Sequence, residues 1–155
     1  MRASISSFFT VAIVALLMGY ASIASAQDMR EETMIVVIGD TRFEVALYDN
    51  NATRSLLQSL PQSIDMSAWG DEFYGRLSQP INHDGDAERD MFEIGEVALW
   101  PSGNALCIFF GPTPASKAEE PRMASPGVPF GKIKGDTSSL KNLRDSLRGV
   151  KISVE

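Results

Sequence analysis

The sequence has few of the residues on which thiol and zinc chemistry depend. In 155 residues it holds one cysteine, Cys107, and one histidine, His83. A single cysteine excludes an intrachain disulfide, and the apolar neighbours of Cys107 predict a small buried side chain instead of a reactive thiol. Zinc sites combine several Cys or His ligands, so we expect no zinc, and we expect no cofactor.

Positive charge is also in short supply. The 14 Lys and Arg residues face 20 Asp and Glu residues, and the formal net charge is −6. No basic cluster interrupts this balance. Nucleic-acid binding needs a basic surface that neutralises phosphates, so the composition argues against a nucleic-acid partner.

Long apolar runs are confined to the first residues. Phe8 to Tyr20 is mostly apolar, follows the basic start Met1-Arg2 and precedes Ala24-Ser25-Ala26, a small-residue cleavage pattern. The run is shorter than the roughly 20 residues that cross a bilayer. We therefore expect a signal peptide at residues 1–26, cleavage after Ala26, a periplasmic or secreted product, and no membrane partner after cleavage.

The remaining chain has the length of one domain. Residues 27–32 are polar without periodicity, and we expect a flexible leader there and a domain over residues 33–155. Two β-rich runs, Thr33 to Ile38 and Thr41 to Tyr48, flank Gly39-Asp40 and predict a hairpin.

Two short helices are expected. The first, Ala52 to Leu60, follows the capping residues Asp49-Asn50-Asn51 and stops at Pro61. The second, Ser138 to Arg148, has leucines at helical spacing and ends at Gly149, before a final strand from Val150 to Glu155.

Several short strands are expected between the helices. Gly, Pro, Asn and Asp residues separate them, and Pro112 to Pro126 forms the longest loop. Many short strands with few helices favour a closed β-barrel or a sandwich. The expected strands are Ser63 to Ser67, Glu96 to Trp100, Ala105 to Phe110 and Phe130 to Lys134.

Four local motifs, in this order of elements, resemble the small bacterial cyclophilin-like proteins. They are Tyr74-Gly75, Trp100 to Asn104, Phe109 to Pro114 and Phe130-Gly131. The resemblance implies a mainly β fold, a closed cyclophilin-like β-barrel with two short α-helices. Because the role of these relatives is not established, the resemblance implies a fold and no chemistry.

The same resemblance raises the question of peptidyl-prolyl isomerase activity. Active cyclophilins hold the proline ring in an apolar pocket and donate from an arginine to the prolyl nitrogen, which lowers a barrier of about 18–20 kcal/mol. Their Phe-His-Arg and Gln-Gly-Gly-Asp motifs are missing here. Arg76 is the nearest substitute for the arginine and Phe110 for the pocket phenylalanine, although a solvated arginine and a core phenylalanine are the simpler interpretations.

An acidic segment offers alternating oxygen donors. Gly85 does not fall where calcium-binding loops place their glycine, and Arg89 offsets part of the charge, so we interpret the segment as an exposed loop and expect no metal site. The donors are Asn82, Asp84, Asp86, Glu88 and Asp90.

Aromatic and polar residues in turn-rich segments give the candidate binding site. Trp and Tyr at such positions often line recognition pockets, although they also plug barrel ends. We expect an exported module that binds a small molecule or a proline-containing peptide; an isomerase using Arg76, or a structural domain docking through the Pro112 to Pro126 loop, are the alternatives. The sequence leaves the oligomeric state open. The candidate residues are Glu72, Tyr74, Arg76, Trp100, Asn104, Phe109 and Phe110, accompanied by Trp69 and Phe73.

Overall fold

The computed structural model describes residues 27–155, so the signal peptide expected at residues 1–26 lies outside the described residues. None of the helices described there is long and apolar enough to cross a membrane. In chain order the elements are β1 (Met29–Ile38), β2 (Thr41–Tyr48), α1 (Asn51–Gln58), β3 (Gln62–Ala68), β4 (Glu72–Arg76), β5 (Arg89–Met91), β6 (Glu96–Trp100), the 3-10 turn η1 (Pro101–Gly103), β7 (Ala105–Phe109), β8 (Arg122–Ile133), the 3-10 turn η2 (Ser138–Asn142) and β9 (Ser146–Val154).

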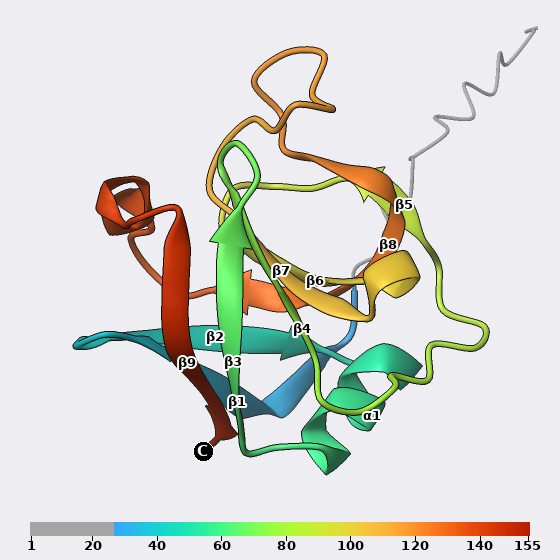
Figure 1. Ribbon diagram of the computed structural model, residues 1–155. Coiled ribbons are helices and arrows are strands. Elements are labelled where there is room, and N and C mark those ends of the chain that lie inside the picture. The colour runs from blue at the N-terminus through green and yellow to red at the C-terminus, as the bar shows by residue number, and fades with distance from the viewer. Residues whose placement is uncertain (1–26) are drawn as a thin grey trace, which may run out of the picture.

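The strands form a closed antiparallel barrel (Figure 1). Eight of them follow one another in the order β2-β1-β9-β3-β4-β7-β6-β8, and pairing of β2 with β8 closes the ring. At this seam Leu47 lies opposite Gly131, where an added Cβ would stand 2.2 Å from the Ala46 carbonyl oxygen. β5 lies outside the ring and pairs with β8. The mainly β class and the closed barrel predicted from the sequence are confirmed.

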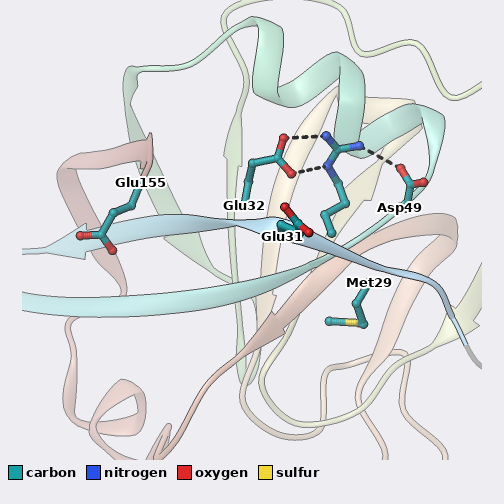
Figure 2. Close-up of a pocket in the computed structure, with 6 residues that line it drawn as sticks. Met29, Glu31, Glu32, Asp49 and Glu155 are labelled. Carbon is teal, nitrogen blue, oxygen red and sulfur yellow. Dashed lines mark hydrogen bonds and ion pairs between the residues drawn. The ribbon is translucent and has the colours of Figure 1, made fainter.

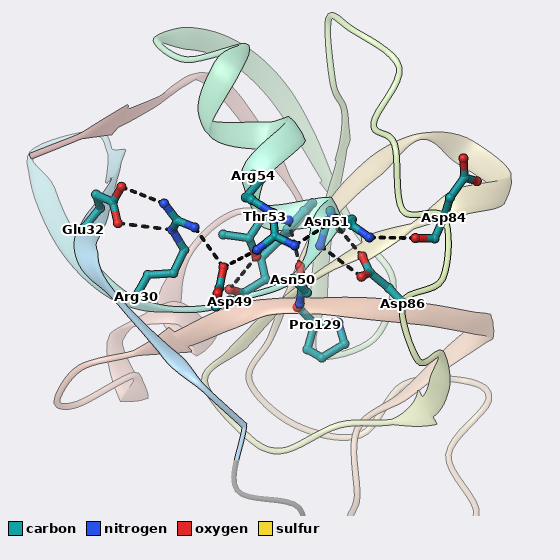
Figure 3. Close-up of polar contacts among 12 residues, drawn as sticks. Arg30, Glu32, Asp49, Asn50, Asn51, Thr53, Arg54, Asp84, Asp86 and Pro129 are labelled. Atoms are coloured by element: carbon teal, nitrogen blue, oxygen red, sulfur yellow. Dashed lines mark hydrogen bonds and ion pairs between the residues drawn. The ribbon is translucent and has the colours of Figure 1, made fainter.

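The predicted hairpin and the first helix are also confirmed. β1 and β2 pair around Gly39-Asp40, with Ile38 opposite Thr41. The Asn50 side chain caps α1 by accepting from the Thr53 N–H at 2.8 Å. Figure 3 shows Asp86 beside the same helix end, where its carboxylate accepts from the Asn51 and Ala52 N–H groups at 3.0 and 2.7 Å.

The prediction of a second helix, Ser138 to Arg148, is wrong. Only the 3-10 turn η2 forms at its start, and its last residues belong to β9. β9 lies between β1 and β3 and hydrogen bonds to both, while Leu147 packs in the barrel opposite Met66. Pairing satisfies the backbone of three strands at once, and this outweighs the helical spacing of Leu140, Leu143 and Leu147.

Strand ends differ from the expectations at several places. β1 begins at Met29, inside the expected leader at 27–32, and β4 and β5 were not expected. β8 begins at Arg122 and so takes residues 122–126 from the expected long loop. Pro126 and Pro129 lie in this strand, but each falls at a shift of register, where a missing N–H is tolerated.

Candidate functional site

The barrel wall made of β4, β7 and β6 presents two different faces. Strand pairing places Glu72 opposite Phe109 and Tyr74 opposite Cys107. Because side chains alternate along a strand, these residues point outward, whereas Phe73 between them points into the barrel core. Glu72 and Tyr74 therefore both lie on the outer face of this wall.

A second apolar cluster covers this outer face. It is separate from the barrel core and contains Phe92, Ala98, Cys107, Phe109 and Met123, with Trp100 packed against it. The rings of Phe92 and Phe109 stack with their centroids 4.7 Å apart. The cluster therefore forms an apolar layer over the outer face of the wall.

A pocket of about 270 Å³ opens beside this cluster, and we call it the Glu72 pocket. Its wall comes from the β3–β4 turn, β4, the end of β6 and the start of β8. Three aromatic side chains and one carboxylate therefore meet in one cavity. The lining residues are Trp69, Glu72, Tyr74, Trp100, Met123 and Ala124.

Local contacts fix the backbone at Trp69 and the indole ring of Trp100. The Trp69 backbone N–H donates to the Glu72 backbone carbonyl at 2.8 Å across the β3–β4 turn. The Trp100 Nε1–H donates to Ser125 Oγ at 2.8 Å. The Trp100 ring also lies against Gly103, where an added Cβ would stand 2.5 Å from two ring atoms. The Trp100 indole therefore offers the pocket a fixed apolar surface, because its N–H is already engaged.

Glu72 is an uncompensated buried carboxyl. Its residue is 4% exposed, and among the described residues its Oε2 has no hydrogen-bond partner. Burial raises the pKa of Glu72 to about 7, and a hydrogen bond from the Cys107 thiol, a weak donor, offsets only part of this effect. Burial together with the Glu72 charge raises the pKa of Cys107, which keeps the thiol protonated.

A second buried glutamate in the same wall shows what full compensation looks like. Glu96 is 2% exposed, and its carboxylate accepts from Arg89 at 2.6 and 3.0 Å and from the Glu93 N–H at 2.8 Å. The Tyr48 hydroxyl donates to it at 3.1 Å, and burial with the Glu96 charge raises the pKa of Tyr48 to about 12. Glu72 has none of these partners.

The structure brings together only part of the predicted binding set. Glu72, Tyr74 and Trp100 line one pocket, with Trp69 beside them. Phe109 is fully buried in the cluster under the pocket. Phe110 points the other way, into the barrel core, where its ring centroid lies 4.9 Å from that of Phe73.

Arg76 and Asn104 lie elsewhere. Both line a separate pocket with the segment Leu77 to Ile81. The Asn104 side chain accepts from the Ile81 N–H at 3.0 Å and donates to the Gln79 carbonyl at 2.8 Å. Asn104 therefore anchors this loop, and its polar atoms are already used.

Sequence reasoning did not include Met123 and Ala124. Both lie in Pro112 to Pro126, the segment expected to be a loop, where the neighbouring prolines argue against a strand. Once residue 122 is known to start a strand, the alternation of buried Met123 with exposed Ala124 becomes readable.

Two polar regions are already internally paired. In a pocket of about 520 Å³, Arg30 donates to Glu32 and Asp49 at 2.7 and 2.9 Å. Figure 2 shows these two carboxylates on either side of the arginine side chain. In the acidic segment Asp86 caps α1, as Figure 3 shows, and Asp90 pairs with Arg122. Within residues 27–155 no group of three or more His, Cys, Asp or Glu residues is placed to hold a metal ion.

Comparison with known proteins agrees with this architecture. A family model described as cyclophilin-like matches residues 32–155. The chain belongs to the cyclophilin-like family. The cyclophilin-like barrel is also similar to the solution structure of the hypothetical protein AF2241 from Archaeoglobus fulgidus, with a TM-score of 0.68 and 27% identity over 84% of this chain and 98% of that one. A search of curated proteins found no significant match.

Membership of the cyclophilin-like family fixes the fold, and the chemistry has to come from the site itself. The site that this barrel offers is the Glu72 pocket: an aromatic cavity with one carboxyl group at its wall.

Proposed function

We propose that this cyclophilin-like domain is a binding module that takes a small molecule or a peptide side chain in the Glu72 pocket. The observation that carries the proposal is the convergence of Trp69, Tyr74 and Trp100 on a buried carboxyl whose Oε2 lacks a hydrogen-bond partner among the described residues. Apolar walls with few polar groups are typical of ligand sites.

The energetics of Glu72 support this proposal. A buried carboxyl that has only a weak thiol donor and an unpartnered Oε2 destabilises the fold, whereas Glu96 in the same wall is fully paired. A polar or charged ligand group bound beside this carboxyl would compensate part of the cost of burying it. Tyr74 is 37% exposed at the pocket rim, so its ring is free to contact a ligand.

We propose no prolyl isomerase activity, because the two groups that isomerisation needs do not share a cavity. Arg76 lines the pocket next to Pro80, and Phe110 lies in the barrel core. A coupled assay with a proline peptide should show only the uncatalysed rate, with isomerisation over tens to hundreds of seconds. Acceleration that Arg76→Ala abolishes would instead establish the isomerase.

Docking through the β7–β8 loop has no specific support. The loop is closed on itself, since the Ser116 hydroxyl donates to the Glu120 carbonyl at 2.6 Å and accepts from the Thr113 N–H at 2.8 Å. We propose a periplasmic or secreted location for the module, and this proposal depends on the signal-peptide pattern of residues 1–26.

The binding proposal is testable by nuclear magnetic resonance on the ¹⁵N-labelled domain. A fragment panel of small acids, amines, sugars and proline peptides should contain a class that shifts the Trp69 and Trp100 indole signals. Tyr74→Ala should weaken that binding with the domain still folded, whereas Arg76→Ala, on the same strand but at another pocket, should not. A panel in which no class shifts these signals would contradict the proposal.

A further inference from the structure

We infer that the Glu72 pocket binds an alkylammonium group, with the positive charge beside the Glu72 carboxylate and the alkyl groups against the rings of Trp69, Tyr74 and Trp100. This inference rests on the proposed binding function and names its ligand class. Three features of the pocket lead to it: its charge, its aromatic wall and its size.

The charge of the Glu72 pocket favours a cationic ligand. Among the described residues that line the pocket, Glu72 is the one charged group, and no Lys, Arg or His accompanies it. An anionic ligand would therefore meet an unpaired carboxylate, and a neutral apolar ligand would leave Oε2 without a partner. A cation removes both problems, because the charge pair and an N–H or polarised C–H contact compensate the buried carboxylate.

The aromatic lining of the pocket favours an organic cation over a metal ion. A single carboxylate supplies too few oxygen ligands for Ca²⁺ or Mg²⁺, which take about six or more. Aromatic faces attract ammonium groups, and their apolar surface accommodates methyl or methylene substituents. A guanidinium would need acceptors for five N–H donors, and the Trp100 indole offers none.

The volume of the pocket favours a small ammonium group. A pocket of about 270 Å³ lies just below the range of about 300–1,000 Å³ that is typical of sites for drug-sized ligands. A trimethylammonium group with a short tail is smaller than such ligands and suits a pocket of this size. The same chemistry is presented by a free compound such as choline and by the end of a methylated lysine side chain.

Binding should also depend on the ionisation of Glu72. The ionisable groups that face it are the Cys107 thiol on β7 and the Tyr74 phenol on β4; the pocket residues from the β3–β4 turn, β6 and β8 are Trp69, Trp100, Met123 and Ala124, which do not titrate. Because the Glu72 pKa is about 7, more of the carboxyl is ionised at pH 8 than at pH 6. A quaternary ammonium does not titrate, so its affinity should rise by up to about tenfold over this range.

The test uses a matched pair of probes on the wild-type domain. Choline and 3,3-dimethyl-1-butanol have nearly the same shape and differ in charge, and Nα-acetyl-trimethyllysine amide presents the ammonium on a side chain. Titrations followed by tryptophan fluorescence and by indole NMR signals should give an affinity for choline about tenfold or more above that of the neutral isostere. Tighter binding of the lysine derivative than of choline would assign the ligand to a peptide side chain; the reverse would assign it to a free amine.

Variants then connect the charge preference to this pocket. Glu72→Gln should lower the choline affinity about tenfold or more and leave the weak binding of the neutral isostere unchanged, whereas Arg76→Ala should alter neither. If the isostere binds as well as choline, or if Glu72→Gln does not weaken choline, the ammonium inference is overturned while a pocket that binds something remains. If no ammonium probe binds at millimolar concentration, the inference is also overturned, and the fragment panel decides the proposed function separately.

Discussion

Replacing Glu72 by Gln should make the domain more stable at neutral and alkaline pH. The substitution keeps the shape of the side chain and removes its ability to ionise. Glu72 is 4% exposed, has no hydrogen-bond partner for Oε2 among the described residues, and lies beside a thiol that donates weakly. Ionising it in this place is therefore unfavourable.

The direction and size of the effect follow from the pKa. Folding raises the Glu72 pKa from 4.5 to about 7, so between these values the folded protein binds more protons than the unfolded chain. The stabilisation from this group is fully present below pH 4.5 and is lost as the pH rises through 7. At 1.36 kcal/mol for each pKa unit, the loss is about 3 kcal/mol. For a domain of this size that corresponds to a shift in Tm of roughly 10 °C.

The measurement is denaturant unfolding of both proteins from pH 4.5 to pH 8.5. The difference in unfolding free energy, Gln variant minus wild type, should increase with pH by about 3 kcal/mol. Any constant offset from the new amide does not affect this slope, and contributions from ionisable groups that are the same in both proteins cancel in the difference. Glu96→Gln is the matched control: Glu96 is equally buried but paired with Arg89, so its replacement should destabilise the domain by about 1–3 kcal/mol.

Two results would refute the reasoning. A stability difference that stays constant across the pH range would mean that Glu72 titrates as an ordinary carboxyl. A Gln variant that loses stability relative to wild type as the pH rises would mean that the ionised carboxylate is compensated in the folded protein.

Further predictions concern the surroundings of the pocket and of α1. Gly103→Ala should displace the Trp100 ring, because the new Cβ would stand 2.5 Å from it, and should destabilise the domain by about 1–3 kcal/mol with a changed indole NMR signal; an unchanged signal would contradict the packing. Cys107→Ser should lower the Glu72 pKa, since a hydroxyl donates more strongly than a thiol, and should move the pH-dependent loss of stability to lower pH; an unmoved midpoint would argue against the contact. Asp86→Ala should destabilise the domain by about 1 kcal/mol in thermal unfolding through loss of two hydrogen bonds at the start of α1, and no change would mean that Asn50 caps the helix sufficiently alone.

Much of the barrel is readable from local patterns. The alternation of Phe43, Val45 and Leu47 with polar residues gives β2, and Asn50 before a leucine-rich segment gives α1. The bounds of β6 were predicted to the residue, because a continuous apolar run ends at Pro101. In each case the residues that decide the structure lie next to one another in the chain.

The remaining features depend on distant partners. Leucines spaced for a helix near residue 140 become part of β9 only because β1 and β3 are both available for pairing. Four of the six residues that line the Glu72 pocket were predicted from the sequence, but Met123 and Ala124 belong to a strand whose prolines suggest a loop. Arg76 lies two residues from Tyr74 on the same strand and still faces another pocket, which spacing alone does not reveal.

The position of β9 has a consequence for how the chain folds. The ninth strand in sequence is inserted between the first and the third, and β2 meets β8 across most of the chain. Contacts between residues so far apart in sequence slow folding, because the chain loses much conformational entropy before these contacts form and stabilise it. The ring stays open until residues 146–154 pair, so the edges of β1 and β3 remain available to chaperones, or to other unfolded chains, up to that moment.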